Sequence, residues 1–400
     1  MRGVQWMPAR VWATAVWIAA AVLPAQVPSR VPPERPPAPP TTPSRGLPTD
    51  PAFFPLGVWL QDPAFAVRYR AAGINLFVGL WKGPTGEQLG RLAGAGMRVI
   101  CAQNEVGLRH LASSSIVGWM HDDEPDNAQR IASGFGPPVA PKDVVARYRV
   151  MRAADPSRPV LLQLGQGAAW DGWWGRGSRS GHPEDYPRYL EGCDLASCDI
   201  YPVAHRSRIV RDKLWFVAHG VTRMRRFAAD RKPVWSCIEA ASICAGQPLR
   251  PEQLRAEVWM ALIHGARGLV YFVHQLEPKV VPAAVLRDPV LLPALTRINA
   301  RIRSLAPVLH AEAVPDAVNV RSTDRAVPVA SVAKRHGGAL YVFCVGMRPA
   351  ATRLEVELRG RGYQRARVEV LGESRRLTVQ GGVFRDALEA YGVRLFRISP

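Results

Sequence analysis

The chain has 400 residues, of which 48% are hydrophobic, and a formal net charge of +19. The apolar content excludes a wholly disordered protein, and the length predicts two domains or one large barrel with an accessory domain. The charge comes mostly from arginine and is compatible with nucleic acid, an anionic membrane surface or an acidic polysaccharide. However, the arginines are scattered, without a basic helix or interleaved aromatic residues, so we expect no nucleic-acid partner. An arginine-biased genome explains the charge more simply.

The N-terminus has the pattern of a signal peptide, which we expect over residues 1–26. Arg2 and Arg10 supply its positive region, residues 11–23 its apolar core and residues 24–26 a cleavage region. The apolar run is too short for a spanning helix, although an uncleaved anchor is the alternative. A proline-rich stretch at 27–50 then has the composition of an extended linker. We therefore expect export to the periplasm or the extracellular medium, with no membrane association beyond the signal peptide.

Eight short apolar runs alternate with helical stretches over residues 51–312. The expected strands lie at 53–61, 74–80, 97–103, 116–120, 158–164, 194–201, 232–239 and 267–274. The expected helices include stretches at 85–95, 106–112, 141–154, 213–229, 250–264 and 289–305. This α/β alternation predicts parallel strands joined by helical crossovers, and the count fits a (β/α)8 TIM barrel. A doubly wound open sheet is the competing fold, but no glycine-rich phosphate loop follows the first strand.

The character of the sequence changes near residue 313. Short β-rich runs separated by Gly, Pro and Arg-Gly turns lie at 318–321, 327–333, 338–345, 353–358, 366–371, 376–379 and 393–398. Closely spaced strands without intervening helices predict a small C-terminal antiparallel β-sandwich over residues 313–400. We expect this domain to support the barrel, and a sugar-binding module is the alternative.

Polar and aromatic side chains gather at the C-terminal ends of the expected strands, where barrel enzymes place their chemistry. Three tryptophans lie in a glycine-rich loop after the fifth strand, and indoles pack well on the C–H faces of sugars. Packing of the loop itself is the simpler interpretation of these tryptophans. The candidate substrate-binding residues are Trp59, Trp81, Asn104, His121, Asp123, Trp170, Trp173, Trp174, Asp199, Tyr201, Tyr271 and His274.

Two strand ends carry a glutamate. Glu124 follows the fourth strand within an acidic run, and Glu239 ends the seventh. Glycoside hydrolysis requires two carboxyl groups that flank one bond, one to protonate the leaving oxygen and one to attack or to activate water. Burial and neighbouring charges can keep one of them protonated while the other stays ionised. An acidic surface turn is the simpler interpretation of the first glutamate and its neighbours.

The sequence resembles the clan A glycoside hydrolases, barrels whose acid/base glutamate ends strand four and whose nucleophilic glutamate ends strand seven. The resemblance rests on residues 118–125 (GWMHDDEP), 194–202 (DLASCDIYP), 232–239 (KPVWSCIE) and 265–272 (GARGLVYF). It implies that Glu124 is the acid/base, that Glu239 is the nucleophile and that Tyr201 orients Glu239. It implies a carbohydrate substrate and a hydrolase of the retaining type. Asp123 stands where the clan commonly has asparagine, and Tyr271, Phe272 and His274 stand where a tryptophan is common.

These departures leave two further hypotheses open. The barrel could bind glycans without catalysis, having kept the groove and lost the chemistry. It could instead be a metal-dependent hydrolase that uses His121, Asp122, His205 and His274, but these donors are scattered and no His-X-His follows the first strand. We expect no metal and no cofactor. No cysteine spacing resembles a zinc framework, although Cys193 with Cys198, or Cys237 with Cys244, could form disulfides.

Overall fold

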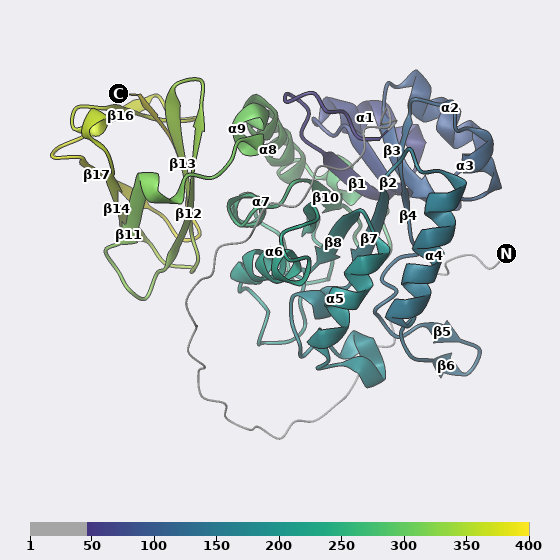
Figure 1. Ribbon diagram of the computed structural model, residues 1–400. Coiled ribbons are helices and arrows are strands. Elements are labelled where there is room, and N and C mark those ends of the chain that lie inside the picture. The colour runs from purple at the N-terminus through teal and green to yellow at the C-terminus, as the bar shows by residue number, and fades with distance from the viewer. Residues whose placement is uncertain (1–45, 400) are drawn as a thin grey trace.

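The structure is a computed structural model that describes residues 46–399. The expected signal peptide (1–26) and most of the expected linker (27–50) lie outside the described residues. Eight parallel strands form a closed barrel in the order β1-β10-β9-β8-β7-β4-β3-β2 (Figure 1). These strands are β1 (Leu56–Gln61), β2 (Leu76–Leu80), β3 (Arg98–Ala102), β4 (Ile116–Met120), β7 (Val160–Leu164), β8 (Leu195–Asp199), β9 (Val234–Glu239) and β10 (Leu269–Phe272). Each lies within, or coincides with, one of the eight expected runs, so the predicted barrel is confirmed.

The barrel closes because β1 pairs with both β10 and β2. Leu56 lies opposite Leu269 and Gly57 opposite Leu76, so the first strand leaves no open edge. Alternate residues face the interior, as the period of two along a strand requires. On β9, Trp235 packs in the cluster that fills the barrel interior. Ile238, of the opposite parity, packs in the layer between strands and helices.

Helices cover the outside of the barrel. They are α1 (Ala66–Ala71), α2 (Gly86–Gly94), α3 (Glu105–Arg109), α4 (Pro141–Ala154), α5 (Tyr186–Tyr189), α6 (Trp215–Phe227), α7 (Pro251–Ile263), α8 (Leu291–Ser304) and α9 (Ala306–His310). Local sequence sets several of their starts. Thr85 and Gln88 form a capping box before α2, and proline occupies the first turn of α4 and of α7.

The C-terminal region consists of two antiparallel sheets. Its strands are β11 (Val318–Ser322), β12 (Val329–His336), β13 (Ala339–Gly346), β14 (Thr352–Leu358), β15 (Arg367–Val370), β16 (Arg375–Thr378), β17 (Val383–Leu388) and β18 (Val393–Ser399). One sheet has the order β11-β14-β17 and the other β12-β13-β18-β15-β16, which confirms the expected β-sandwich. We did not expect β17, whose alternation carries the charged pair Arg385 and Asp386. We also missed the hairpin of β5 (Arg130–Ile131) and β6 (Gly134–Phe135).

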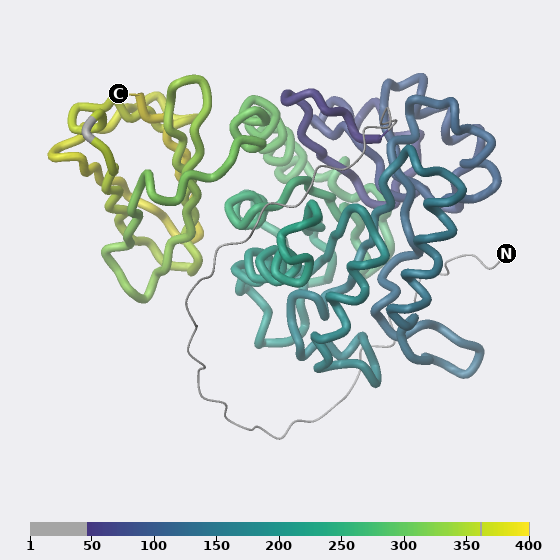
Figure 2. The backbone as a smooth tube through the Cα atoms, in the orientation of Figure 1, coloured from purple at the N-terminus to yellow at the C-terminus, as the bar shows by residue number. Residues whose placement is uncertain are grey.

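The β-sandwich lies beside α7 and α9, on one side of the barrel (Figure 1). The chain passes to it from α9, as the backbone trace shows (Figure 2). Strand β13 reads as almost continuously apolar because both of its faces are covered. Val342 and Cys344 face the core of the sandwich, and Phe343 packs on Trp259 of α7 with ring centroids 5.2 Å apart.

All six cysteines are free, so neither possible disulfide forms in the structure. Cys101, Cys193, Cys198, Cys237 and Cys344 are buried and pack as small hydrophobic side chains. Between residues 46 and 399, no helix is both long and apolar enough to cross a membrane.

Candidate active site

The three acids that follow β4 point in different directions. Asp122 is exposed and forms an ion pair with Arg147 of α4, so it faces the outer helices. Asp123 and Glu124 lie close to Asp199, at the end of β8. They are close enough for the charges of Glu124 and Asp123 to raise the pKa of Asp199. The structure therefore brings Asp123 and Glu124 to the C-terminal mouth of the barrel and sends Asp122 away from it.

Glu124 occupies a strained backbone conformation. Its φ is +43°, in the left-handed region that side chains other than glycine rarely adopt. The Glu124 carboxylate accepts a hydrogen bond of 2.7 Å from the Asn127 amide and is also hydrogen-bonded to the Asp199 carboxyl group. Such strain persists only where the surrounding structure holds it, and it is typical of functional sites.

The surroundings of Glu124 raise its pKa to about 7, from an ordinary value of 4.5. Burial is the largest cause, and the charge of Asp126 adds to it. The hydrogen bonds from Asn127 and Asp199 favour the ionised form and oppose this rise. Near neutral pH, Glu124 is therefore present in both protonation states, as a group that gives and takes a proton must be.

Asp126 fixes the loop that carries Glu124. Its buried carboxylate accepts hydrogen bonds from the backbone N–H of Gly165 (2.9 Å) and from the Tyr186 hydroxyl (3.1 Å). Arg176 donates from Nε to the Asp126 carbonyl (3.3 Å). Because Gly165 directly follows β7, these bonds tie the loop after β4 to the end of the neighbouring strand.

Asp199 and Tyr201 form the next part of the mouth. Asp199 is only 6% exposed, and its Oδ1 has no hydrogen-bond partner within residues 46–399. Burial, and then the charge of Glu124, raise the pKa of Asp199 well above its ordinary value. Tyr201 hydrogen-bonds to Asp199, and its hydroxyl lies 3.4 Å from Cys237 Sγ. A protonated Asp199 beside Glu124 makes a carboxyl pair that shares a proton.

Asp123 completes the acidic cluster at the rim. Its side chain is exposed, yet desolvation by the surrounding protein and the charge of Glu124 raise its pKa well above the ordinary value. With Glu124 and Asp199 it makes three carboxyl groups whose charges influence one another at this end of the barrel. Glu124 and Asp199 are less exposed than Asp123, and repulsion between their like charges disfavours the ionisation of both at once.

Glu239, at the end of β9, belongs to a second carboxyl pair. It is 1% exposed and accepts hydrogen bonds from the backbone N–H groups of Val203 (2.6 Å) and Ala204 (3.0 Å). It also lies beside Glu257, a fully buried residue of α7 whose carboxyl oxygens have no other hydrogen-bond partner among residues 46–399. Burial raises the pKa of Glu239 to about 7, whereas these hydrogen bonds lower it. Burial and the charge of Glu239 raise the pKa of Glu257 well above its usual value, so Glu257 is the protonated member of this pair.

The tryptophan loop after β7 packs around His205, next to the acidic cluster. The ring of His205 lies 5.3 Å from that of Trp170, 6.0 Å from that of Trp173 and 5.8 Å from that of Trp174. Trp173 is buried and donates from Nε1 to Asn127 Oδ1 (2.9 Å), the residue that holds Glu124. Trp174 is 42% exposed, so part of its indole faces solvent. The loop therefore supports the Glu124 side chain and presents one tryptophan to solvent.

Several other candidate binding residues serve structural contacts. Asn104 caps α3, accepting from the Gly107 N–H (2.8 Å). The His121 ring contacts the Gly192 carbonyl (2.8 Å), between the strands and the outer helices. Tyr271 points outward and donates to Asn299 of α8 (2.7 Å). Its neighbour Phe272 takes the inward position and packs against Tyr201, with ring centroids 5.1 Å apart.

Trp59, Trp81 and His274 belong to β1 or to the segments that follow β2 and β10. Trp59 is buried in the interior cluster, below the mouth. Trp81, directly after β2, is half-buried and its carbonyl accepts from Gln88 (2.8 Å). The His274 ring contacts the Trp59 carbonyl and the Gln61 amide, each at 3.1 Å. The donors of the metal hypothesis do not converge, and among the described residues no group of three or more suitable side chains could hold a metal ion.

Sequence reasoning missed Asn127 and Glu257. Asn127 stands three residues after Glu124, and an amide so close to a candidate acid was a usable signal. Glu257 interrupts the apolar face formed by Leu254, Val258 and Ala261, and a charged residue there indicates a buried partner. Asp126 was also missed, since nothing in the sequence separates it from the acids before it.

No protein-family model matches the chain, and no curated protein matches it either. Similarity to solved structures extends over most of the chain. A structure of an AmyP variant in complex with maltotriose has a TM-score of 0.52 at 10% identity, over 88% of this chain and 98% of that one. The noncanonic maltogenic α-amylase AmyB from Thermotoga neapolitana has a TM-score of 0.52 at 10% identity, over 86% and 99%. This confirms the expected fold, a barrel like that of glycoside hydrolases followed by a β-sandwich.

Proposed function

We propose that this protein is an exported glycoside hydrolase of the retaining type, with Glu124 as general acid/base and Glu239 as nucleophile. The observation that carries the proposal is Glu124 itself, a carboxyl group at the mouth of a (β/α)8 barrel with a pKa of about 7. A general acid works best when its pKa lies near the working pH. Asp199 beside it supplies the proton-sharing partner that keeps Glu124 in this range.

Glu239 is proposed as nucleophile because it ends β9, the seventh strand of the barrel. The N–H groups of Val203 and Ala204 and the protonated Glu257 all favour its ionised form. Because the side chain is only 1% exposed, the proposal requires the segment that carries these N–H groups to move when a sugar binds. Asp199 is the alternative nucleophile, since it already contacts Glu124.

The substrate is proposed to be a polysaccharide or oligosaccharide. The exposed face of Trp174 offers a surface on which a sugar ring can pack. AmyP has been solved with maltotriose and with maltose, so α-glucans belong first in a substrate panel. β-Linked glucans, xylans and acidic polysaccharides complete it.

The test of the nucleophile compares the wild type with Glu239→Gln and Asp199→Asn on a substrate from this panel. We expect Glu239→Gln to abolish turnover and Asp199→Asn to remain active with a shifted pH profile. Turnover by Glu239→Gln at the wild-type rate, with loss in Asp199→Asn, transfers the role to Asp199. Nuclear magnetic resonance of the first-formed product should show the anomeric configuration of the substrate, as retention requires. Glycan binding without any product, across the whole panel, supports a non-catalytic barrel instead.

Export is proposed from the sequence, since residues 1–26 have the pattern of a signal peptide. Expression of the full chain in a bacterial host, followed by mass spectrometry of the protein in each compartment, tests it. We expect a mature chain that starts near residue 27 outside the cytoplasm. A full-length chain confined to the cytoplasm contradicts export.

A further inference from the structure

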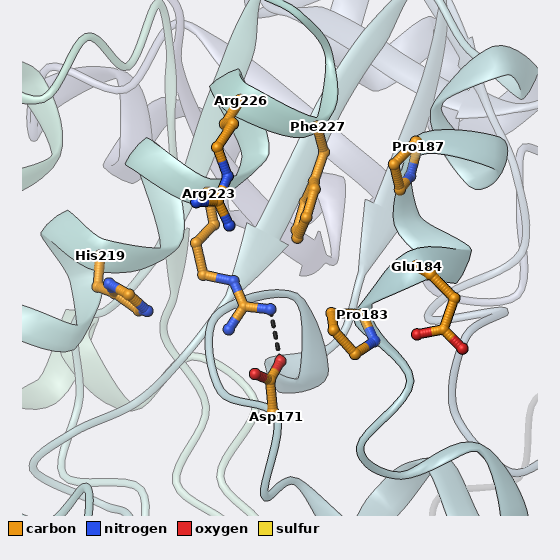
Figure 3. Close-up of a pocket in the computed structure, with 8 residues that line it drawn as sticks. All are labelled: Asp171, Pro183, Glu184, Pro187, His219, Arg223, Arg226 and Phe227. Carbon is orange, nitrogen blue, oxygen red and sulfur yellow. Dashed lines mark hydrogen bonds and ion pairs between the residues drawn. The ribbon is translucent and has the colours of Figure 1, made fainter. Parts of the chain in front are cut away.

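We propose that a pocket on the outer side of the barrel binds the anionic group of an acidic saccharide, a carboxylate or a sulfate. The inference rests on the proposed function, because it concerns a second contact with the same class of ligand. The pocket lies between α6 and the segment formed by the 3-10 turn η4 (Pro183–Asp185) and α5, and has a volume of about 490 Å³ (Figure 3). This size is within the usual range of small-ligand sites.

Two arginines of α6 supply positive charge to this pocket. Arg223 is only 7% exposed, donates to Asp171 at 2.5 Å and leaves its Nε without a partner among residues 46–399. Arg226 is exposed, lies 5.7 Å from the Phe227 ring and forms no ion pair with any described residue. In Figure 3 both side chains extend from the helix on the same side of the pocket. A buried N–H without an acceptor is unfavourable, and an anion would satisfy it.

The acidic residues of the lining do not neutralise this charge. Asp171 is paired with Arg223. Glu184 is hydrogen-bonded to His182 (2.7 Å) and ion-paired with Arg179 (3.4 Å), and both partners lie outside the pocket lining. His219, also in the lining, has a pKa lowered by burial and by Arg223 and Arg226, so it stays neutral near pH 7. Arg226 is therefore the charge left for a ligand, and guanidinium groups bind carboxylate and sulfate oxygens well.

The other walls are apolar. Phe227 stands between the arginines and two prolines, Pro183 and Pro187 (Figure 3). An aromatic ring beside a cationic group suits a sugar that has a C–H face and an acidic substituent, better than it suits a small inorganic ion. Asp171 of the lining directly follows Trp170, so the tryptophan loop leads from the pocket to His205.

The test measures binding in the Glu124→Gln background, where turnover does not consume the ligand. The probes are digalacturonic acid, a sulfated disaccharide, neutral maltose and free sulfate, each titrated calorimetrically. Arg226→Ala removes the exposed charge, and Arg149→Ala removes an equally exposed arginine of α4 that is outside the pocket. We expect at least one acidic disaccharide to bind, with affinity about tenfold lower in Arg226→Ala and unchanged in Arg149→Ala.

Equal affinities in the two arginine variants, or binding of free sulfate alone, overturn the inference. A preference for digalacturonic acid or for the sulfated sugar identifies which anionic group the pocket takes. Hydrolysis is measured separately on neutral substrates with the Glu124-containing protein. Arg226-dependent binding without hydrolysis supports the pocket and rejects the proposed function. Hydrolysis without Arg226-dependent binding supports the proposed function and rejects the pocket.

Discussion

Glu124 is held by side chains that tune its proton affinity in opposite directions. Burial and the charge of Asp126 favour the protonated form, while Asn127 and Asp199 favour the ionised form. The hydrogen bond from Asn127 therefore affects both the pKa of Glu124 and the position of its carboxyl group. Trp173 holds the other end of that amide.

We predict that Asn127→Ala moves the alkaline limb of the kcat/KM profile to higher pH. In the wild type, activity should fall as pH rises through about 7, because Glu124 loses the proton it must donate. Removing a hydrogen bond to the carboxylate disfavours the ionised form, so the pKa rises further. The measurement is kcat/KM between pH 4 and pH 10 on one aryl glycoside.

Asp122→Asn is the matched control for the Asn127→Ala prediction. It changes an acid two residues from Glu124 whose contact is an exposed ion pair with Arg147. Exposed pairs contribute little, about 0–1 kcal/mol, so stability and pH profile should both stay close to wild type. A shift of the same size in Asp122→Asn would show that the Asn127 effect is not specific.

For single residues, the sequence predicted the place in the barrel better than the direction in which the side chain points. The placing of Glu124 at the mouth could be predicted from the apolar run and the proline that frame it. The outward turn of Asp122 could not, since it depends on Arg147 twenty-five residues later. Tyr271 was assigned to the binding site, although it alternates with Val270 and Phe272, which point inward. In β1, Leu60 has a φ of +48°, and Gln61 accepts a hydrogen bond from the Tyr69 hydroxyl. The sequence pattern does not predict this local irregularity.

Among the elements, the tryptophan loop connects packing to recognition. Its three indoles surround His205, and burial lowers the pKa of that histidine to about 4, so the ring is neutral over the working range. The sequence indicated an aromatic surface or a packed loop, and the structure contains both. Trp173 packs inside, whereas Trp174 is exposed.

We predict that Trp174→Ala raises KM about fivefold and leaves kcat within a factor of about two. Loss of an aromatic surface removes on the order of 1 kcal/mol of contact with a sugar ring, without touching the proton donor. Trp174→Phe, which keeps a ring, should retain most of the affinity. Steady-state kinetics on an oligosaccharide, together with melting temperatures, check this; a fall in kcat alone would exclude a binding role.

Across the whole molecule, the β-sandwich supports the helix behind Glu239. Phe343 packs on Trp259 of α7, two residues from Glu257. Tyr391 donates to the Asp212 carbonyl (2.6 Å), in the same loop that holds Val203 and Ala204. The arrangement of eight barrel strands and a sandwich could be predicted from alternation and strand spacing. The packing of the sandwich on α7 could not be predicted, because the sequence does not show which outer faces of the two domains meet.

We predict that Phe343→Ala destabilises the protein by about 3–5 kcal/mol, as expected for a fully buried phenylalanine. Activity should also fall before global unfolding, because α7 then loses its support. Phe135→Ala in the β5–β6 hairpin, a 44% exposed site, is the matched control and should stay within about 0.5 kcal/mol of wild type. Urea unfolding followed by fluorescence measures both; equal stabilities would mean that the two domains are energetically independent.

The most direct test of Glu124 as proton donor is the leaving-group dependence of Glu124→Gln. The wild type and the variant are assayed on aryl glycosides that share a sugar and differ in the acidity of the phenol. We expect kcat/KM to fall by roughly 10²–10⁴-fold for the least acidic phenol and much less for the most acidic one, which leaves without a proton. The alkaline limb near pH 7 should vanish as well. An equal loss on every glycoside, or none, would remove Glu124 from that role.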